Sequence, residues 1–152
     1  RRDDVLALAA EIARQHGLDA AWVEAALAQA RHQPTIVKLM APPPAGTAKN
    51  WAAYRSRFVE PLRIRAGVAF WREHEARLRE AEARWGVPAE IVVGIIGVET
   101  IYGRHMGNFR VLDALATLAF DFPKEARRDR SAFFRDELEH FLLLCRQQGL
   151  DP

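Results

Sequence analysis

The sequence predicts a mainly α-helical fold for its 152 residues, a length that fits one domain. Three observations lead to this prediction. Apolar residues recur every three or four positions along most of the chain, which is the spacing of one helix face. Residues that favour helix ends, such as Asp, Asn, Pro and Gly, stand at the borders of these stretches. No stretch alternates apolar and polar residues over the length of a strand.

Two predicted helices open the chain. The first runs from Asp3 to His16 and precedes Gly17, a residue type suited to a left-handed C-terminal cap. The carboxylate of Asp19 can cap the second helix. We expect both helices to turn an apolar face to the core, formed by Val5, Leu8, Ala9, Ile12, Trp22, Val23, Ala26 and Leu27.

The helical spacing stops at residues 33–49, which contain a run of three prolines and are interpreted as a connecting loop. Asn50 can then cap a short helix over 51–59. Pro61 can begin a longer helix that continues to about Trp85 with a charged outer face. The candidates for its buried face are Leu62, Val68, Ala69, Trp71 and Leu78.

The second half of the chain continues with helices. One begins at Pro88 and extends to about Gly103, and a short Ala- and Leu-rich helix follows with Asp113 as its candidate cap. Asp129 or Ser131 can cap the last helix. Its inward-facing residues are predicted to be Phe133, Phe134, Leu138, Phe141, Leu142 and Cys145.

Composition limits the classes of function. The 22 basic and 20 acidic residues leave a net charge of +2, and no basic stripe with aromatics appears, so we expect no nucleic-acid partner. The single cysteine excludes an internal disulfide. The chain begins with Arg1 rather than Met and no apolar leader precedes it, which indicates a processed product. The longest apolar run, 91–103, contains a glutamate and is too short to span a bilayer.

The helix with the sequence PAEIVVGIIGVETIYG carries the candidate chemistry. It is apolar all round, which predicts a place in the centre of a domain. Gly94 and Gly97 are unfavourable inside a helix and suggest that another backbone approaches closely. Between Glu90 and Arg104, Glu99 is the only carboxylic acid, and it extends the stripe of Val92, Ile95 and Ile96.

Two effects would act on a glutamate at this position. Partial burial and the negative end of the helix dipole both favour the protonated carboxyl, which can donate a proton to a leaving glycosidic oxygen. The alternative is a structural acid that pairs with an arginine, for instance Arg104. The pattern alone leaves both interpretations open.

Four segments resemble the soluble lytic transglycosylase B family of murein-degrading enzymes: NWAAYRSRFVEPLRIRAGVAFW, GVPAEIVVGIIGVETIYGRHMG, RVLDALATLAFDFP and SAFFRDELEHFLLLC. The N-terminal helices resemble it too, so nearly the whole chain is covered. The resemblance implies a lysozyme-like, mainly α catalytic domain, of which residues 1–152 would be the N-terminal helical part. It implies cleavage of the β-1,4 bond between N-acetylmuramic acid and N-acetylglucosamine, which leaves a 1,6-anhydro end.

The resemblance also implies the residues of the site. Glu99 would be the single acid and base, and Tyr54, Tyr102 and Arg104 would contact the glycan or its peptide. Packing is the alternative role for Tyr54 and Tyr102, and pairing with an acid is the alternative for Arg104. No metal ligand set and no cofactor are expected. The competing functions are a lysozyme-like hydrolase that uses the same glutamate, and a non-catalytic helical module that binds glycan or a partner protein through the region of Tyr54 and Trp51.

The resemblance sets expectations about context as well. Family members continue beyond the position of Pro152, so we expect these residues alone to be weakly active or inactive and to expose apolar surface. The partners implied are peptidoglycan glycan strands and other cell-wall enzymes. The implied location is the periplasm or the inner face of the outer membrane of a Gram-negative bacterium, with membrane association through an N-terminal lipid anchor.

Overall fold

The computed structural model describes residues 2–43, 46 and 48–152, and every regular element in that part of the chain is an α-helix. The prediction of a mainly α fold is therefore confirmed. The chain divides into two compact units, each with its own packing. We call Arg1–Ala45 with Phe109–Pro152 the terminal unit, and Gly46–Asn108 the central unit. Part of the predicted loop, residues 44, 45 and 47, lies outside the described residues.

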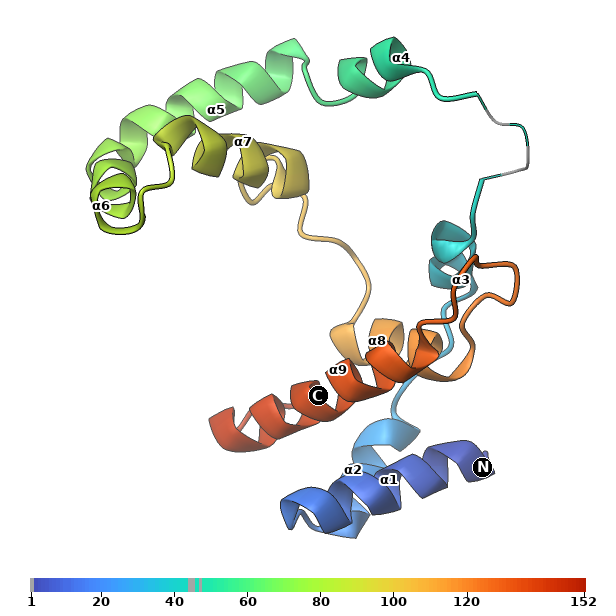
Figure 1. Ribbon diagram of the computed structural model, residues 1–152. Coiled ribbons are helices and arrows are strands. Elements are labelled where there is room, and N and C mark those ends of the chain that lie inside the picture. Colours follow the sequence, from blue (N-terminus) through green and yellow to red (C-terminus); the bar gives the residue numbers. More distant parts are fainter. Residues whose placement is uncertain (1, 44–45, 47) are drawn as a thin grey trace. The chain divides into compact units, whose positions relative to one another are not determined.

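The terminal unit consists of α1 (Asp3–His16), α2 (Ala20–Ala28), α3 (Pro34–Met40), α8 (Val111–Phe120) and α9 (Ser131–Gln148). Helices α1 and α2 form a hairpin, and α8 lies along α9 (Figure 1). The predicted caps of the hairpin are present, because Gly17 has a φ of 62° and the Asp19 carboxylate accepts the Ala21 amide at 3.0 Å. The core of the terminal unit is apolar and contains the fully buried side chains of Ile12, Val23, Leu112, Leu138 and Leu142.

Helix α3 was not predicted, since it lies inside the segment interpreted as a loop. It begins at Pro34, whose fixed φ suits the first turn of a helix.

The role predicted for Asp113 is also wrong. Instead of capping α8, this buried carboxylate lies in its first turn and accepts hydrogen bonds from the Arg31 amide at 2.9 Å and Gln33 Nε2 at 3.2 Å. It thus joins the segment before α3 to α8.

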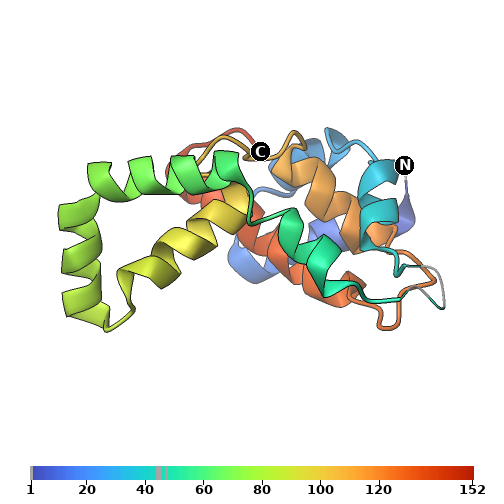
Figure 2. The same ribbon diagram turned by 90° about the horizontal axis from the view of Figure 1, so that it is seen from above.

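The central unit consists of α4 (Trp51–Ser56), α5 (Pro61–Glu73), α6 (Glu75–Trp85) and α7 (Ala89–Thr100). Helix α6 turns away from the end of α5, and α7 returns toward the beginning of α5 (Figure 2). The single helix predicted from Pro61 to Trp85 is therefore wrong. It breaks at His74, whose φ of −112° and ψ of 18° are not helical. The turn allows Leu78 of α6 to pack in a small core with Ala89 and Val93.

The buried face of α5 differs from the prediction. Leu78 is buried and Trp71 is half-buried, but Leu62, Val68 and Ala69 are exposed. The buried positions are instead Ala66 and Gly67. At Gly67 a larger side chain would not fit, because a Cβ added there would lie 3.0 Å from Tyr102 Cζ.

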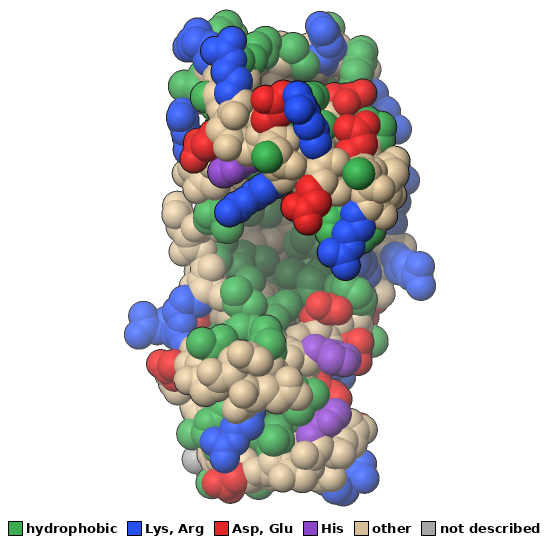
Figure 3. Space-filling model, turned by 90° about the vertical axis from the view of Figure 1, so that its left-hand side faces the viewer, with side chains coloured by type: hydrophobic (Ala, Val, Ile, Leu, Met, Phe, Trp, Pro, Cys, Tyr) green, Lys and Arg blue, Asp and Glu red, His purple; other side chains and the backbone are tan. Residues whose placement is uncertain are grey.

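The charged outer face predicted for this region is present on α6. Acidic and basic side chains lie over this helix on the face shown in Figure 3. Arg79 and Glu75 form an exposed ion pair there at 2.6 Å. In the described part of the chain, no helix combines the length and the apolar character needed to cross a membrane.

Candidate active site

Glu99 lies in the last turn of α7. The sequence predicted that this helix would be buried on all sides, and that prediction is wrong within this chain. Its buried face contains Ala89, Val93 and Gly97, which meet α5 and α6. The opposite face remains open, with Ile95 57% exposed and Val98 45% exposed.

Glu99 belongs to the open face of α7. Its side chain is exposed, so the described residues do not supply the burial expected from the sequence. The reason is geometric. Successive residues of an α-helix are rotated by about 100°, which places Glu99 about 200° from the buried Gly97. The stripe assumed from Val92 through Glu99 therefore runs from the edge of the buried face, at Val92 and Ile96, onto the open face.

The backbone directly after Glu99 adopts an uncommon conformation. Ile101 and Tyr102 have φ values of 50° and 57°, in the left-handed region that β-branched and aromatic residues rarely enter. Each such residue costs about 1–3 kcal/mol, and surrounding contacts must hold it. Thr100 supplies two of these contacts, because its hydroxyl accepts the Gly103 amide at 3.0 Å and its carbonyl accepts the His105 amide at 2.8 Å.

The left-handed turn directs the ring of Tyr102 back between α5 and α7. A Cβ added at Gly97 would lie 2.7 Å from Tyr102 Cζ, and one added at Gly67 would lie 3.0 Å from the same atom. The phenol therefore occupies a slot that only two glycines leave open. The ring also packs against Phe70, with 5.2 Å between ring centroids. These contacts give Tyr102 a packing role.

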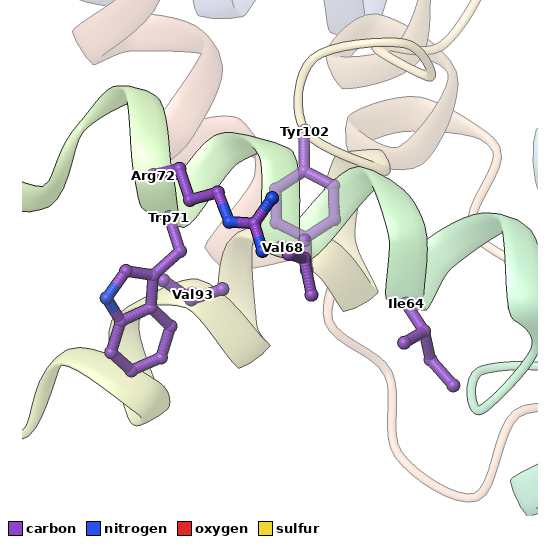
Figure 4. Close-up of a pocket in the computed structure, with 7 residues that line it drawn as sticks. Ile64, Val68, Trp71, Arg72, Val93 and Tyr102 are labelled. Atoms are coloured by element: carbon purple, nitrogen blue, oxygen red, sulfur yellow. The ribbon is translucent and has the colours of Figure 1, made fainter.

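The same ring lines a pocket of about 430 Å³ on the central unit. Figure 4 shows side chains that line it, which are aliphatic or aromatic except for the guanidinium of Arg72. The lining residues are Ile64, Gly67, Val68, Trp71, Arg72, Val93 and Tyr102.

The close approach predicted at the glycines of α7 occurs only at Gly97, and a phenol rather than a backbone makes it. At Gly94 an added Cβ would meet no described atom within 4 Å. Gly94 lies on the open face of the helix, so the close approach stays a prediction at this residue.

Tyr54 is an exposed aromatic residue on α4, with 53% of its surface accessible. It stacks on Trp51, with 5.7 Å between the ring centroids, and packs against Phe58, with 5.0 Å between the ring centroids. Trp51 is 70% exposed. Asn50 caps this helix as predicted, since its side-chain oxygen accepts the Ala53 amide at 2.9 Å. The three rings form an aromatic row, of which Trp51 and Tyr54 remain accessible for a ligand.

Arg104 is exposed and forms no ion pair with Glu99. Both residues are among those that the structure describes. The alternative in which Glu99 is a structural acid paired with Arg104 therefore loses its stated partner. His105 and Met106, which follow Arg104, are exposed as well.

Arg63 was not predicted as a residue of this site. Its guanidinium is largely buried between α5 and α7, and 14% of its side chain is exposed. Its Nε donates to the Gly97 carbonyl at 2.9 Å, and its Nη1 donates to the Arg57 carbonyl at 2.6 Å. Nothing in the sequence distinguishes it from Arg65, which is exposed two residues later. The position of the buried stripe on α5 decides which arginine turns inward.

A family model described as Transglycosylase SLT domain matches residues 1–152. The chain belongs to this transglycosylase SLT domain family. Within the family, it is 42% identical to the membrane-bound lytic murein transglycosylase B of Escherichia coli strain K12 over an aligned length of 150 residues. The match covers 93% of this chain and 40% of that protein.

Solved structures of lytic transglycosylases are similar to this member of the transglycosylase SLT domain family. The Escherichia coli enzyme Slt35, in complex with bulgecin A, has a TM-score of 0.87 at 39% identity over 100% of this chain and 47% of that chain. SltB3 from Pseudomonas aeruginosa, in complex with NAG-NAM-pentapeptide, has a TM-score of 0.72 at 30% identity over 93% of this chain and 36% of that chain. The chain thus spans less than half the length of each of these relatives.

Proposed function

We propose that this chain is part of the catalytic domain of a lytic transglycosylase that cleaves the bond between N-acetylmuramic acid and N-acetylglucosamine in peptidoglycan. The observation that carries the proposal is the isolated carboxylate of Glu99 at the end of an otherwise uncharged helix face, in a chain of the transglycosylase SLT domain family. The accessible aromatic residue Tyr54 of the same unit supports it, because aromatic rings provide apolar contact area beside polar groups, as sugar binding requires.

In the proposed reaction, Glu99 begins as a carboxylic acid. It donates its proton to the glycosidic oxygen as the bond between that oxygen and C1 of the muramyl residue breaks. The carboxylate then accepts the proton of the C6 hydroxyl while that oxygen forms a bond with C1. The acid is restored and water is not consumed. One carboxyl group thus serves both steps, as an exception to the pair of carboxylates common in glycosidases.

The acids that could have supplied a second carboxylate have other partners. Asp113 is buried and accepts two hydrogen bonds. Asp121 binds Arg2 at 2.7 Å, and Asp136 lies 3.8 Å from His140. These contacts give the three carboxylates structural roles within the terminal unit.

The proposal extends to partners and location. The partners would be peptidoglycan strands, in line with the complex of SltB3 and NAG-NAM-pentapeptide. The location would be the Gram-negative cell envelope, with attachment to a membrane in the manner suggested by the name of the Escherichia coli relative. Tyr54 and Arg104 would lie along the bound substrate. Tyr102 would act indirectly, since its packing shapes the end of α7.

The proposed function is tested with the intact protein and its Glu99→Gln variant, both incubated with purified peptidoglycan. Mass spectrometry should detect anhydro-muropeptides only with the unchanged protein. Equal products from both proteins would make Glu99 non-catalytic. Residues 1–152 alone should release these products weakly or not at all, because positioning of the sugar supplies a large share of catalysis.

A further inference from the structure

The side chain of Arg63 joins three segments of the central unit. In addition to the Gly97 and Arg57 carbonyls, its Nη1 donates to the Phe58 carbonyl at 3.2 Å. These carbonyls belong to α7 and to the segment that follows α4. The guanidinium also lies 5.5 Å from the centre of the Phe58 ring. One side chain of α5 therefore links the segment after α4 to α7.

The carbonyls that Arg63 binds lie close in the chain to the two candidate site residues. Gly97 precedes Glu99 by two residues in the last turns of α7. Phe58 touches Tyr54 ring to ring, with 5.0 Å between centroids. A continuous set of contacts thus leads from Tyr54 through Phe58, Arg63 and Gly97 to the turn that carries Glu99.

Contacts with Glu60 help to hold the guanidinium in place. The Glu60 carboxylate accepts the Arg63 amide at 3.1 Å and lies 3.8 Å from Arg63 Nη1. A largely buried charge is costly unless it is hydrogen-bonded, and here three carbonyl contacts and one carboxylate surround it. Lysine cannot replace this arrangement, because its ammonium is a single point rather than a planar fork.

We propose that Arg63 is a positioning residue that fixes the glycan-binding face of α4, at Tyr54, relative to the carboxyl group of Glu99. The proposal rests on the proposed function. Arg63 does not touch the substrate. It holds the sugar-contacting ring and the acid at the separation that the reaction requires, and a misplacement of about 1 Å in such an arrangement can cost about a hundredfold in rate.

The test compares Arg63→Lys and Arg63→Gln with the unchanged intact protein on soluble glycan strands, at a temperature where circular dichroism shows each variant to be folded. We expect kcat/KM to fall by about tenfold to a hundredfold, with an increase in KM. Leu78→Val is the matched control, since Leu78 is buried in the same unit but has no part in the Arg63 contacts. An unfolded fraction lowers the apparent kcat alone, so this control should keep its KM.

Coupling to Tyr54 makes the test specific. In a Tyr54→Ala background, Arg63→Lys should reduce kcat/KM by a smaller factor than in the unchanged protein, because one of the two groups that Arg63 holds is then absent. Full additivity of the two losses, or an unchanged KM in both Arg63 variants, would overturn the positioning role and leave the proposed function intact. If the unchanged protein released no anhydro-muropeptides, the proposed function would fall, and this inference with it.

Amide hydrogen exchange gives a second readout that does not depend on activity. The Ile101 amide bonds the Gly97 carbonyl at 3.3 Å, and the Val59 amide bonds the Arg55 carbonyl at 2.9 Å. Both amides should exchange faster in Arg63→Lys than in Leu78→Val. Equal exchange in the two variants would show that Arg63 does not hold these segments, and would overturn the inference.

Discussion

Substitution of the two glycines of α7 by alanine should have opposite effects on stability. Alanine in a helix interior is favoured over glycine by about 1 kcal/mol. At Gly94 no described atom lies within 4 Å of the new methyl group, so Gly94→Ala should raise the free energy of unfolding by up to about that amount.

At Gly97 the new methyl group would lie 2.7 Å from Tyr102 Cζ, whereas carbon atoms in contact are about 3.5–4.0 Å apart. The ring must therefore withdraw by about 1 Å. Its room to do so is limited, because Gly67 borders the same phenol and Phe70 packs on the ring. Overpacking of this kind costs about 1–3 kcal/mol. Since the helix-propensity gain is the same at both positions, Gly97→Ala should be less stable than Gly94→Ala by about 1–3 kcal/mol.

Urea unfolding of the three proteins, followed by tryptophan fluorescence and circular dichroism, measures this difference. Tyr102→Ala supplies the control, since in that background the two glycine substitutions should have equal effects. The reasoning about the slot would be refuted if Gly97→Ala were at least as stable as Gly94→Ala.

Two further predictions concern the terminal unit. The pKa of His140 is raised by the hydrogen bond from its Nδ1 to the Asp136 carbonyl at 2.8 Å, and then by the nearby Asp136 carboxylate. The stability that this contributes is therefore present below the unfolded-state pKa, about 6.5, and is lost as pH rises through the folded-state pKa. An NMR titration should show a lower His140 pKa in Asp136→Asn, which keeps the backbone carbonyl and removes the carboxylate. An unchanged value would contradict the contribution of the carboxylate. Asp113→Ala should destabilise the unit by about 2–4 kcal/mol in urea unfolding, because the donors on Arg31 and Gln33 lose their acceptor. Asp113→Asn keeps one acceptor and should cost less, and equal losses would refute this role.

Features set by local chemistry were predictable from the sequence. The caps at Gly17, Asp19 and Asn50 depend only on the residue and its neighbours, and all three formed. The break at His74 was not predictable, because it depends on where Leu78 finds its core. Hydrophobic spacing marks both halves of the region 61–85 as helical, and it contains no signal for the change in direction.

In the candidate site too, the features set by local sequence were predictable and those set by tertiary packing were not. Glu99 stands out in the sequence because it is the one carboxylic acid after the first turn of an apolar helix. Its exposure was not predicted, because the orientation of α7 depends on the contact between Gly97, Gly67 and Tyr102. The left-handed turn at Ile101 runs against local preference, and tertiary contacts maintain it.

The central claim is that Glu99 acts on the glycan without adding water. Digestion of peptidoglycan by the intact protein in water labelled with oxygen-18, followed by mass spectrometry of the new muramyl ends, tests it most directly. We expect products that are lighter than hydrolysis products by one water and carry no label, and no products from Glu99→Gln. Labelled reducing ends would show that water attacks C1, which would make the protein a hydrolase and contradict the proposed reaction.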